Sequence, residues 1–160
     1  MDRFLSSAVN RIDAKGRVSV PARFRTVLAR RGDQELYALK GLDRPALDVG
    51  GIDLLDRYEQ RIAAEDPFLQ TADDMSYFVH GDSDFLKLDQ DGRITVNDFI
   101  RDHTGITTEV AFVGRGAFFQ MWEPLQLAAY GAQVRQRLLK LRQEAVSVRN
   151  DAGITGGDPE

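Results

Sequence analysis

The sequence contains no cysteine, only one tryptophan and two histidines, and no long run of apolar residues. Without cysteine, the chain has no disulfide, no thiol nucleophile and no thiolate metal ligand. No stretch predicts a membrane-spanning helix, and the first residues do not resemble a signal peptide. The remaining composition, 42% hydrophobic and 29% charged, is ordinary for a globular protein. We therefore expect a soluble cytoplasmic protein with no membrane partner.

Motifs for catalysis and for cofactors are also missing. His80 and His103 stand in separate segments without partners at ligand spacing, so each is expected to be a surface or capping residue. Gly50-Gly51 lacks the lysine and hydroxyl residue of a phosphate-binding loop. We therefore expect no enzyme activity, no metal and no cofactor.

One pattern, by contrast, occurs twice. Residues 12–25 and 88–101 share an apolar residue, Asp, Gly, Arg, an apolar/hydroxyl/apolar triplet, and a second Arg eight positions after the first. So many shared features at fixed spacing indicate an internal duplication. In each copy, the Asp and Gly predict a tight turn, followed by a short strand and a helix. Asn97 takes the place of Pro21 and, as a good N-cap, is expected to begin the second helix.

The charge is distributed unevenly along the chain. The formal net charge is −4, yet residues 1–31 hold eight basic groups against two acidic ones. The remaining residues hold 13 basic and 23 acidic groups, so a +6 segment precedes a −10 body. A basic pole on an acidic body indicates a face presented to a polyanion, although a solvated basic helix face has the same composition.

The two copies organise the expected layout. Residues on either side of Pro67 have helical spacing and predict a helical pair, and those after Pro124 form an apolar seam with steps of three and four. We expect this seam to pack on the core, and contact with a partner helix is the alternative. The predicted segments are a first repeat (1–50), a helical pair (51–81), a second repeat (82–123), a C-terminal helix (124–148) and a flexible tail (149–160).

The repeated turn predicts an arginine held in place by an aspartate. Asp13 is expected to pair with Arg17 across the base of the turn, which would orient the guanidinium for a phosphate or a guanine. Lys15 adds a point charge, whereas the second copy has Asp91 at that position. We therefore expect the first copy to bind and the second mainly to complete the fold.

The segment Asp-Ala-Lys-Gly-Arg-Val-Ser-Val-Pro-Ala near the N-terminus, repeated as Leu-Asp-x-x-Gly-Arg-Ile-x-Val, resembles the MraZ family of bacterial transcriptional regulators. The resemblance implies an α+β fold in which two AbrB/SpoVT-like swapped-hairpin halves form an intramolecular pseudo-dimer barrel. It also implies a ring-shaped homo-oligomer in the nucleoid. There, such proteins bind direct repeats in double-stranded promoter DNA of their own division and cell-wall gene cluster, usually as repressors.

Two alternative functions would use the same basic face. One is a scaffold that binds an acidic protein, and the other is an antitoxin-like regulator whose C-terminal helix neutralises a toxin. For DNA binding, the family signature maps onto Asp13 and Arg17, and onto Asp89 and Arg93 in the second copy. The predicted DNA-binding residues are Asp13, Lys15, Arg17, Arg23, Arg25, Arg11 and Arg93.

Overall fold

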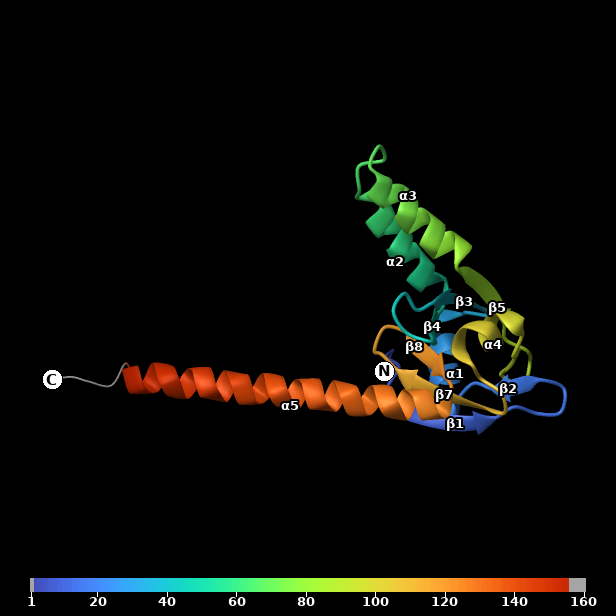
Figure 1. Cartoon of the computed structure of the whole chain (residues 1–160). Helices are drawn as coiled ribbons and strands as arrows, with labels where there is room; N and C mark the ends of the chain where they lie inside the picture. The colour runs from blue at the N-terminus through green and yellow to red at the C-terminus, as the bar shows by residue number, and fades with distance from the viewer. Residues whose placement is uncertain (1, 156–160) are drawn as a thin grey trace. The chain divides into compact units, whose positions relative to one another are not determined.

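The computed structural model describes residues 2–155, and the chain divides into two units after Pro124. The first unit is α+β (Figure 1). Its elements are β1 (Ser7–Arg11), β2 (Arg17–Ser19), α1 (Ala22–Arg31), β3 (Glu35–Lys40), β4 (Ala46–Gly50), α2 (Ile52–Ala63), α3 (Gln70–Ser76), the π-helix η1 (Tyr77–Gly81), β5 (Ser83–Lys87), β6 (Arg93–Thr95), α4 (Asp98–Thr104), β7 (Glu109–Gly114) and β8 (Phe119–Trp122). Helix α5 (Pro124–Thr155) begins at the last residue of the first unit and forms the described part of the second.

Strands of the two copies alternate within the sheets. Six strands form one antiparallel sheet in the order β1-β7-β8-β4-β3-β5, and β2 pairs with β6 in a separate two-stranded sheet. Only the hairpins β3–β4 and β7–β8 pair strands of the same copy, whereas β1–β7, β3–β5, β4–β8 and β2–β6 join the copies. The equivalent strands of the two copies are β1 and β5, β3 and β7, and β4 and β8. When these are matched, the strand order is the same from either end of the sheet, which agrees with an internal duplication.

The prediction of a closed barrel is wrong for residues 2–155. β1 and β5 are the two ends of the six-stranded sheet, and neither pairs with the other. β2 and β6, at three residues each, pair only with one another. Each is followed at once by a helix, at Pro21 or Asn97, so neither strand is long enough to close the larger sheet.

The helices α1 and α4 are equivalent in the two copies. Asn97 accepts a hydrogen bond from the Ile100 N–H at 3.1 Å, which confirms that asparagine caps the second helix where Pro21 precedes the first. Gly32 and Gly105 end α1 and α4 in the left-handed conformation, each at φ 74°. Local residue chemistry therefore sets both ends of each helix.

Both copies contribute to one hydrophobic core. The Phe24 ring of α1 lies 5.4 Å from that of Phe4 and 5.0 Å from that of Phe119, and all three are buried. Val18 and Ile94 are direct partners in β2–β6 and are also buried. Each short strand thus buries one side chain and leaves its two neighbours at or near the surface.

The segment between the copies forms the predicted helical pair, and α2 and α3 lie against each other (Figure 1). The expected second helix differs in detail, because α3 begins at Gln70 and continues into η1. A small cluster under these helices contains buried Tyr37, Leu39 and Val79. Burial raises the pKa of Tyr37 to about 12, and its hydroxyl donates to the Val79 carbonyl.

A polar network surrounds the buried Gln120 at the centre of the large sheet. Gln120 on β8 donates to its register partner Asp48 on β4 at 2.7 Å. The side-chain oxygen Oε1 of Gln120 accepts from Trp122 Nε1 and from Arg115 Nη1, each at 3.0 Å. Burial raises the pKa of Asp48, and the hydrogen bond from Gln120 opposes this effect. The central strands of the two copies are therefore joined through side chains as well as backbone.

Helix α5 continues to Thr155, beyond the expected end at 148. Residues 156–160 of the predicted flexible tail lie outside the described residues. Along the helix, Leu138 and Leu141 of the predicted seam have exposed fractions of 60% and 62%. The packing of this seam on the core stays a prediction.

We expect Phe24→Ala to lower the free energy of unfolding by about 3–5 kcal/mol, because the truncation leaves a cavity between buried rings. Urea denaturation would measure the loss. Leu42→Ala is the control, since Leu42 is 83% exposed and should change stability by less than about 0.5 kcal/mol. A loss at Phe24 no larger than the control's would contradict a core shared by the two copies.

Candidate nucleic-acid interface

The turn from Asp13 to Arg17 is built around one carboxylate. Asp13 Oδ1 accepts hydrogen bonds from the backbone N–H groups of Lys15 and Arg17, at 2.9 and 2.8 Å. Gly16 adopts φ 79°, and its N–H donates to the Asp13 carbonyl at 3.0 Å. The second carboxylate oxygen, Oδ2, accepts from Arg17 Nε at 3.1 Å. The expected pairing of Asp13 with Arg17 is therefore present, and it orients the guanidinium.

The second copy builds the same turn from Asp89 to Arg93. Asp89 Oδ1 accepts from the backbone N–H groups of Asp91 and Arg93, at 2.8 and 2.9 Å, and Gly92 adopts φ 76°. The turns differ at the middle residue. Asp91 Oδ2 accepts from Arg93 Nη2 at 2.7 Å, whereas the Lys15 side chain pairs with no described residue.

The two turns are joined through their glycine carbonyls. The N–H of Val20 donates to Gly92 O at 2.9 Å, and the N–H of Val96 donates to Gly16 O at 2.8 Å. Each bond runs from the residue after one short strand to the turn of the other copy. The exchange places the two Asp-x-x-Gly-Arg turns beside the single β2–β6 ribbon. In each strand the arginine is followed by a buried residue, Val18 or Ile94, so both arginines lie on the opposite face of the ribbon from the core.

Asp13 also links the two arginines. Its Oδ2 lies 3.1 Å from Arg17 Nε and 3.9 Å from Arg93 Nη1. Arg93 Nε lies 3.4 Å from Asp89 Oδ2 as an ion pair, but it has no hydrogen-bond partner among residues 2–155. With Asp91, two guanidinium groups and three carboxylates therefore form one cluster, which we call the turn cluster.

Backbone hydrogen bonding favours the ionised form of both anchoring carboxylates. The Arg17 N–H is the largest cause that lowers the pKa of Asp13, and the Arg93 N–H does the same for the pKa of Asp89. Desolvation opposes the shift in each case. Both aspartates are therefore anionic at neutral pH and act as fixed acceptors for their turns.

Helix α1 brings one predicted arginine against the second turn. Arg25 Nε donates to the Val20 carbonyl at 3.0 Å. Its side chain also covers the buried Gly92, where an added Cβ would collide with Arg25 Cδ. The first copy's second arginine therefore touches the second copy's turn.

Two other predicted residues lie outside this cluster. Arg23 on α1 is exposed and donates to Ser6 Oγ at 3.0 Å. Arg11 ends β1, is exposed, and stands opposite Glu109 of β7 in the strand register. Both are accessible cations, but no direct contact joins them to the turn cluster within residues 2–155.

Sequence reasoning missed three residues around these groups. Asn10 Nδ2 donates to the Ser19 carbonyl at 2.7 Å and so ties β1 to β2. Ser6 has φ 75° and receives Arg23. The sequence identifies Asp91 only as the counterpart of Lys15 and does not by itself reveal its contact with Arg93. The signal for this contact is the spacing, because Asp91 stands two residues before Arg93 in the same turn.

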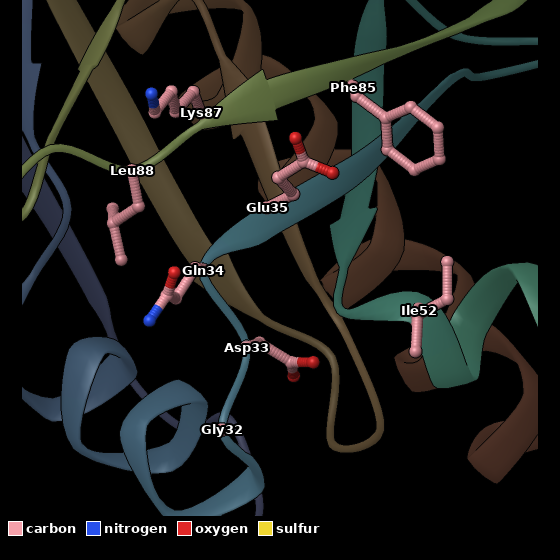
Figure 2. Close-up of a pocket in the computed structure, with 8 residues that line it drawn as sticks. All are labelled: Gly32, Asp33, Gln34, Glu35, Ile52, Phe85, Lys87 and Leu88. Carbon is pink, nitrogen blue, oxygen red and sulfur yellow. The ribbon is translucent and has the colours of Figure 1, made fainter.

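A separate hollow of about 570 Å³ lies where β3 and β5 meet the start of α2 (Figure 2). Glu35 and Lys87 are register partners at its edge. One carboxylate oxygen of Asp33 is buried and has no hydrogen bond. Burial is the main cause that raises the pKa of Asp33, and the negative charge of the nearby Asp53 raises it further. Within residues 2–155, no three His, Cys, Asp or Glu side chains gather as a metal site requires. The hollow thus offers one desolvated carboxylate rather than a catalytic set.

No protein-family model matches the chain. Among curated proteins, the "Transcriptional regulator MraZ" of Rhizobium rhizogenes is 58% identical over 136 residues, which cover 85% of this chain and 93% of the relative. The protein of that name from Rhizobium meliloti is 54% identical over 136 residues, 85% of this chain and 93% of the relative. That of Azorhizobium caulinodans is 37% identical over 157 residues, 98% of this chain and all of the relative. The chain belongs to the MraZ family.

Membership of the MraZ family confirms the resemblance that the duplicated motif predicted. In this MraZ chain, both copies of the motif fall on the turns just described, and their arginines lie in the one turn cluster. None of the helices within residues 2–155 has the length and apolar character needed to cross a membrane.

The two turn glycines allow a matched test in this MraZ protein. Gly16→Ala and Gly92→Ala should each destabilise by about 1–2 kcal/mol, because both residues have positive φ. Gly92→Ala should cost a further ~0.5–1.5 kcal/mol, since its Cβ would push the Arg25 side chain aside and break its hydrogen bond to the Val20 carbonyl, whereas nothing lies within 4 Å of a Cβ at Gly16. Thermal unfolding would compare the two variants, and equal losses would refute the packing of Arg25 on Gly92.

The lowered pKa of Asp13 predicts how the stability of this MraZ protein depends on pH. The unfolded pKa is near ~3.9, so the ionised carboxylate stabilises the fold fully above about pH 4–5. That contribution is lost as the pH falls through the lower folded pKa. Asp13→Asn should therefore reduce the denaturation midpoint at neutral pH and converge with the parent protein toward pH ~2. A constant difference at every pH would contradict this role of the carboxylate.

Proposed function

We propose that this chain is a sequence-specific DNA-binding transcription regulator that represses the division and cell-wall gene cluster containing its own gene. The relatives' name supports the regulatory role. The observation that carries the DNA-binding part is Arg17. Its guanidinium is held at Nε by Asp13, and neither Nη atom has a hydrogen-bond partner among residues 2–155.

The chemistry of Arg17 suits nucleic acid. Two terminal N–H groups in a rigid fork match the two acceptors of a guanine edge or of a phosphate. The side chain is 29% exposed, and the carboxylate that holds it limits its rotation, so less entropy is lost on binding. Lys15 at the tip of the turn adds an unpaired positive charge next to it.

The remaining predicted residues fit a supporting role. Arg11 and Arg23 are exposed and belong to the +6 segment, and Arg25 reaches the second turn. Such cations bind phosphates and set the position of the protein, while sequence is read by groups that reach base edges. The acidic remainder of the chain would repel DNA elsewhere and limit non-specific binding.

Assembly completes the proposal. The alternation of strands from the two copies supports a swapped-hairpin pseudo-dimer within one chain. One subunit presents few cations and would bind weakly. A ring-shaped homo-oligomer on promoter direct repeats would engage several subunits together and raise the affinity through effective concentration. The protein would then act in the cytoplasm, at the nucleoid, without catalysis or a cofactor.

A second function is favoured by one observation, the exposed apolar stripe of α5. Leu138, Leu141 and Val148 are 60–68% exposed and fall at heptad positions. A scaffold or an antitoxin-like protein would use this stripe to hold a partner helix. A scaffold would show no sequence-dependent DNA binding, so the experiment below separates it from the regulator. An antitoxin-like protein would instead have a small toxin gene beside its own gene and a C-terminal region that is unstable when free.

Arg17→Ala should abolish binding to the DNA upstream of the protein's own gene without unfolding the protein. One lost bidentate contact costs about 1–3 kcal/mol for each subunit, and several subunits multiply the loss. A mobility-shift assay at two salt concentrations would measure binding, and circular dichroism would check the fold. Arg93→Ala should weaken binding less. Unchanged binding by Arg17→Ala would remove Arg17 from the mechanism, and greater damage from Arg93→Ala would reverse the roles of the copies.

A further inference from the structure

The two turns share their backbone geometry but hold their arginines differently. Arg17 meets one carboxylate, at Nε, and no other ion-pair partner among residues 2–155. Arg93 meets three, with 2.7 Å from Nη2 to Asp91, 3.4 Å from Nε to Asp89 and 3.9 Å from Nη1 to Asp13. The two side chains are almost equally exposed, at 29% and 27%, so pairing rather than burial distinguishes them.

Local charge differs in the same direction. The first turn carries Asp13, Lys15 and Arg17, which sum to +1. The second carries Asp89, Asp91 and Arg93, which sum to −1. A phosphate that approaches the second turn therefore meets a net negative group, and it must displace a charge-assisted hydrogen bond to reach Arg93.

We propose that Asp91 blocks Arg93, by occupying the part of the guanidinium that DNA would otherwise take, and so makes the two-copy surface directional. This inference rests on the proposed DNA-binding function. Two equal turns related by an internal two-fold would read an inverted pair of half-sites, as symmetric dimers do. Because Asp91 holds Arg93, the first turn makes the main contact with DNA and the second turn contributes less. Each subunit therefore binds its site in one orientation.

The position of Asp91 supports a role in specificity rather than in folding. Its backbone N–H bonds to Asp89, but its side chain is 72% exposed and bonds only to Arg93. Lys15 occupies the same place in the first turn without any such contact, and that turn forms equally well. The backbone therefore tolerates either residue, and the choice decides whether the arginine is held or available.

The block can be tested without DNA. Phenylglyoxal modifies accessible guanidinium groups, and peptide mass spectrometry measures the rate at each arginine. In the parent protein Arg17 should react several-fold faster than Arg93. Asp91→Asn should raise the rate at Arg93 and leave that at Arg17 unchanged. Equal rates in the parent protein, or no change in the variant, would overturn the proposed block.

The consequence for DNA is tested with Asp91→Asn and Asp91→Lys in the mobility-shift assay. In the parent protein, DNA must break an exposed ion pair to reach Arg93, which costs about 0.5–1 kcal/mol. Asp91→Asn removes this cost and should tighten binding about 2- to 5-fold for each subunit. Asp91→Lys should tighten it further, steepen the salt dependence, and permit binding to an inverted repeat of the half-site. Asp56→Asn removes the same charge from an exposed position on α2 and should change nothing.

The outcomes separate the two proposals. If the parent protein binds its upstream DNA and Asp91→Asn binds no better, the inference fails and the proposed function stands. If the parent protein binds no DNA at any salt concentration, the proposed function fails, and the directional reading fails with it. Thermal unfolding of each variant ensures that a change in affinity is not a change in folded fraction.

Discussion

The structure depends on a reciprocal exchange of two backbone hydrogen bonds, from Val20 to the Gly92 carbonyl and from Val96 to the Gly16 carbonyl. In each turn an aspartate carboxylate accepts from two backbone N–H groups and so fixes the turn that presents the glycine carbonyl. The exchange holds the short ribbon of β2 and β6 together and directs Val18 and Ile94 into the core. Both arginines are consequently placed on the opposite side of the ribbon.

Backbone symmetry coexists with side-chain asymmetry in this protein. A homodimer would carry every substitution twice, so its two turns would have to stay identical. Here the halves are fused, and Lys15 and Asp91 differ although they occupy equivalent positions. The same is true at the helix starts, where Pro21 and Asn97 precede equivalent helices through different chemistry. Fusion thus keeps the fold of a dimer while it allows each half a separate role.

Features set by local chemistry could be predicted from the sequence. The turns at Asp13 and Asp89, the cap at Asn97 and the helix end at Gly105 each depend on a few adjacent residues. The strand partners could not be predicted, because the runs at 36–39 and 110–113 have similar apolar patterns and either could pair with several neighbours. The closed barrel is an expectation from the family resemblance alone, and the described sheet is open because β1 and β5 end it without pairing with each other.

The candidate site shows the same division. The Asp13–Arg17 pair follows from spacing alone, since the turn brings these residues together. The bridge from Asp13 to Arg93 depends on the packing of one copy against the other, which no local pattern encodes.

The alternation of strands also has a consequence for synthesis. β1 finds its partner only in β7, where Ser7 lies opposite Val113, so the N-terminal strand leaves the ribosome long before its neighbour exists. The arginines therefore cannot take their places before β6 has been translated, and the large sheet cannot be completed before β7 and β8 have been translated.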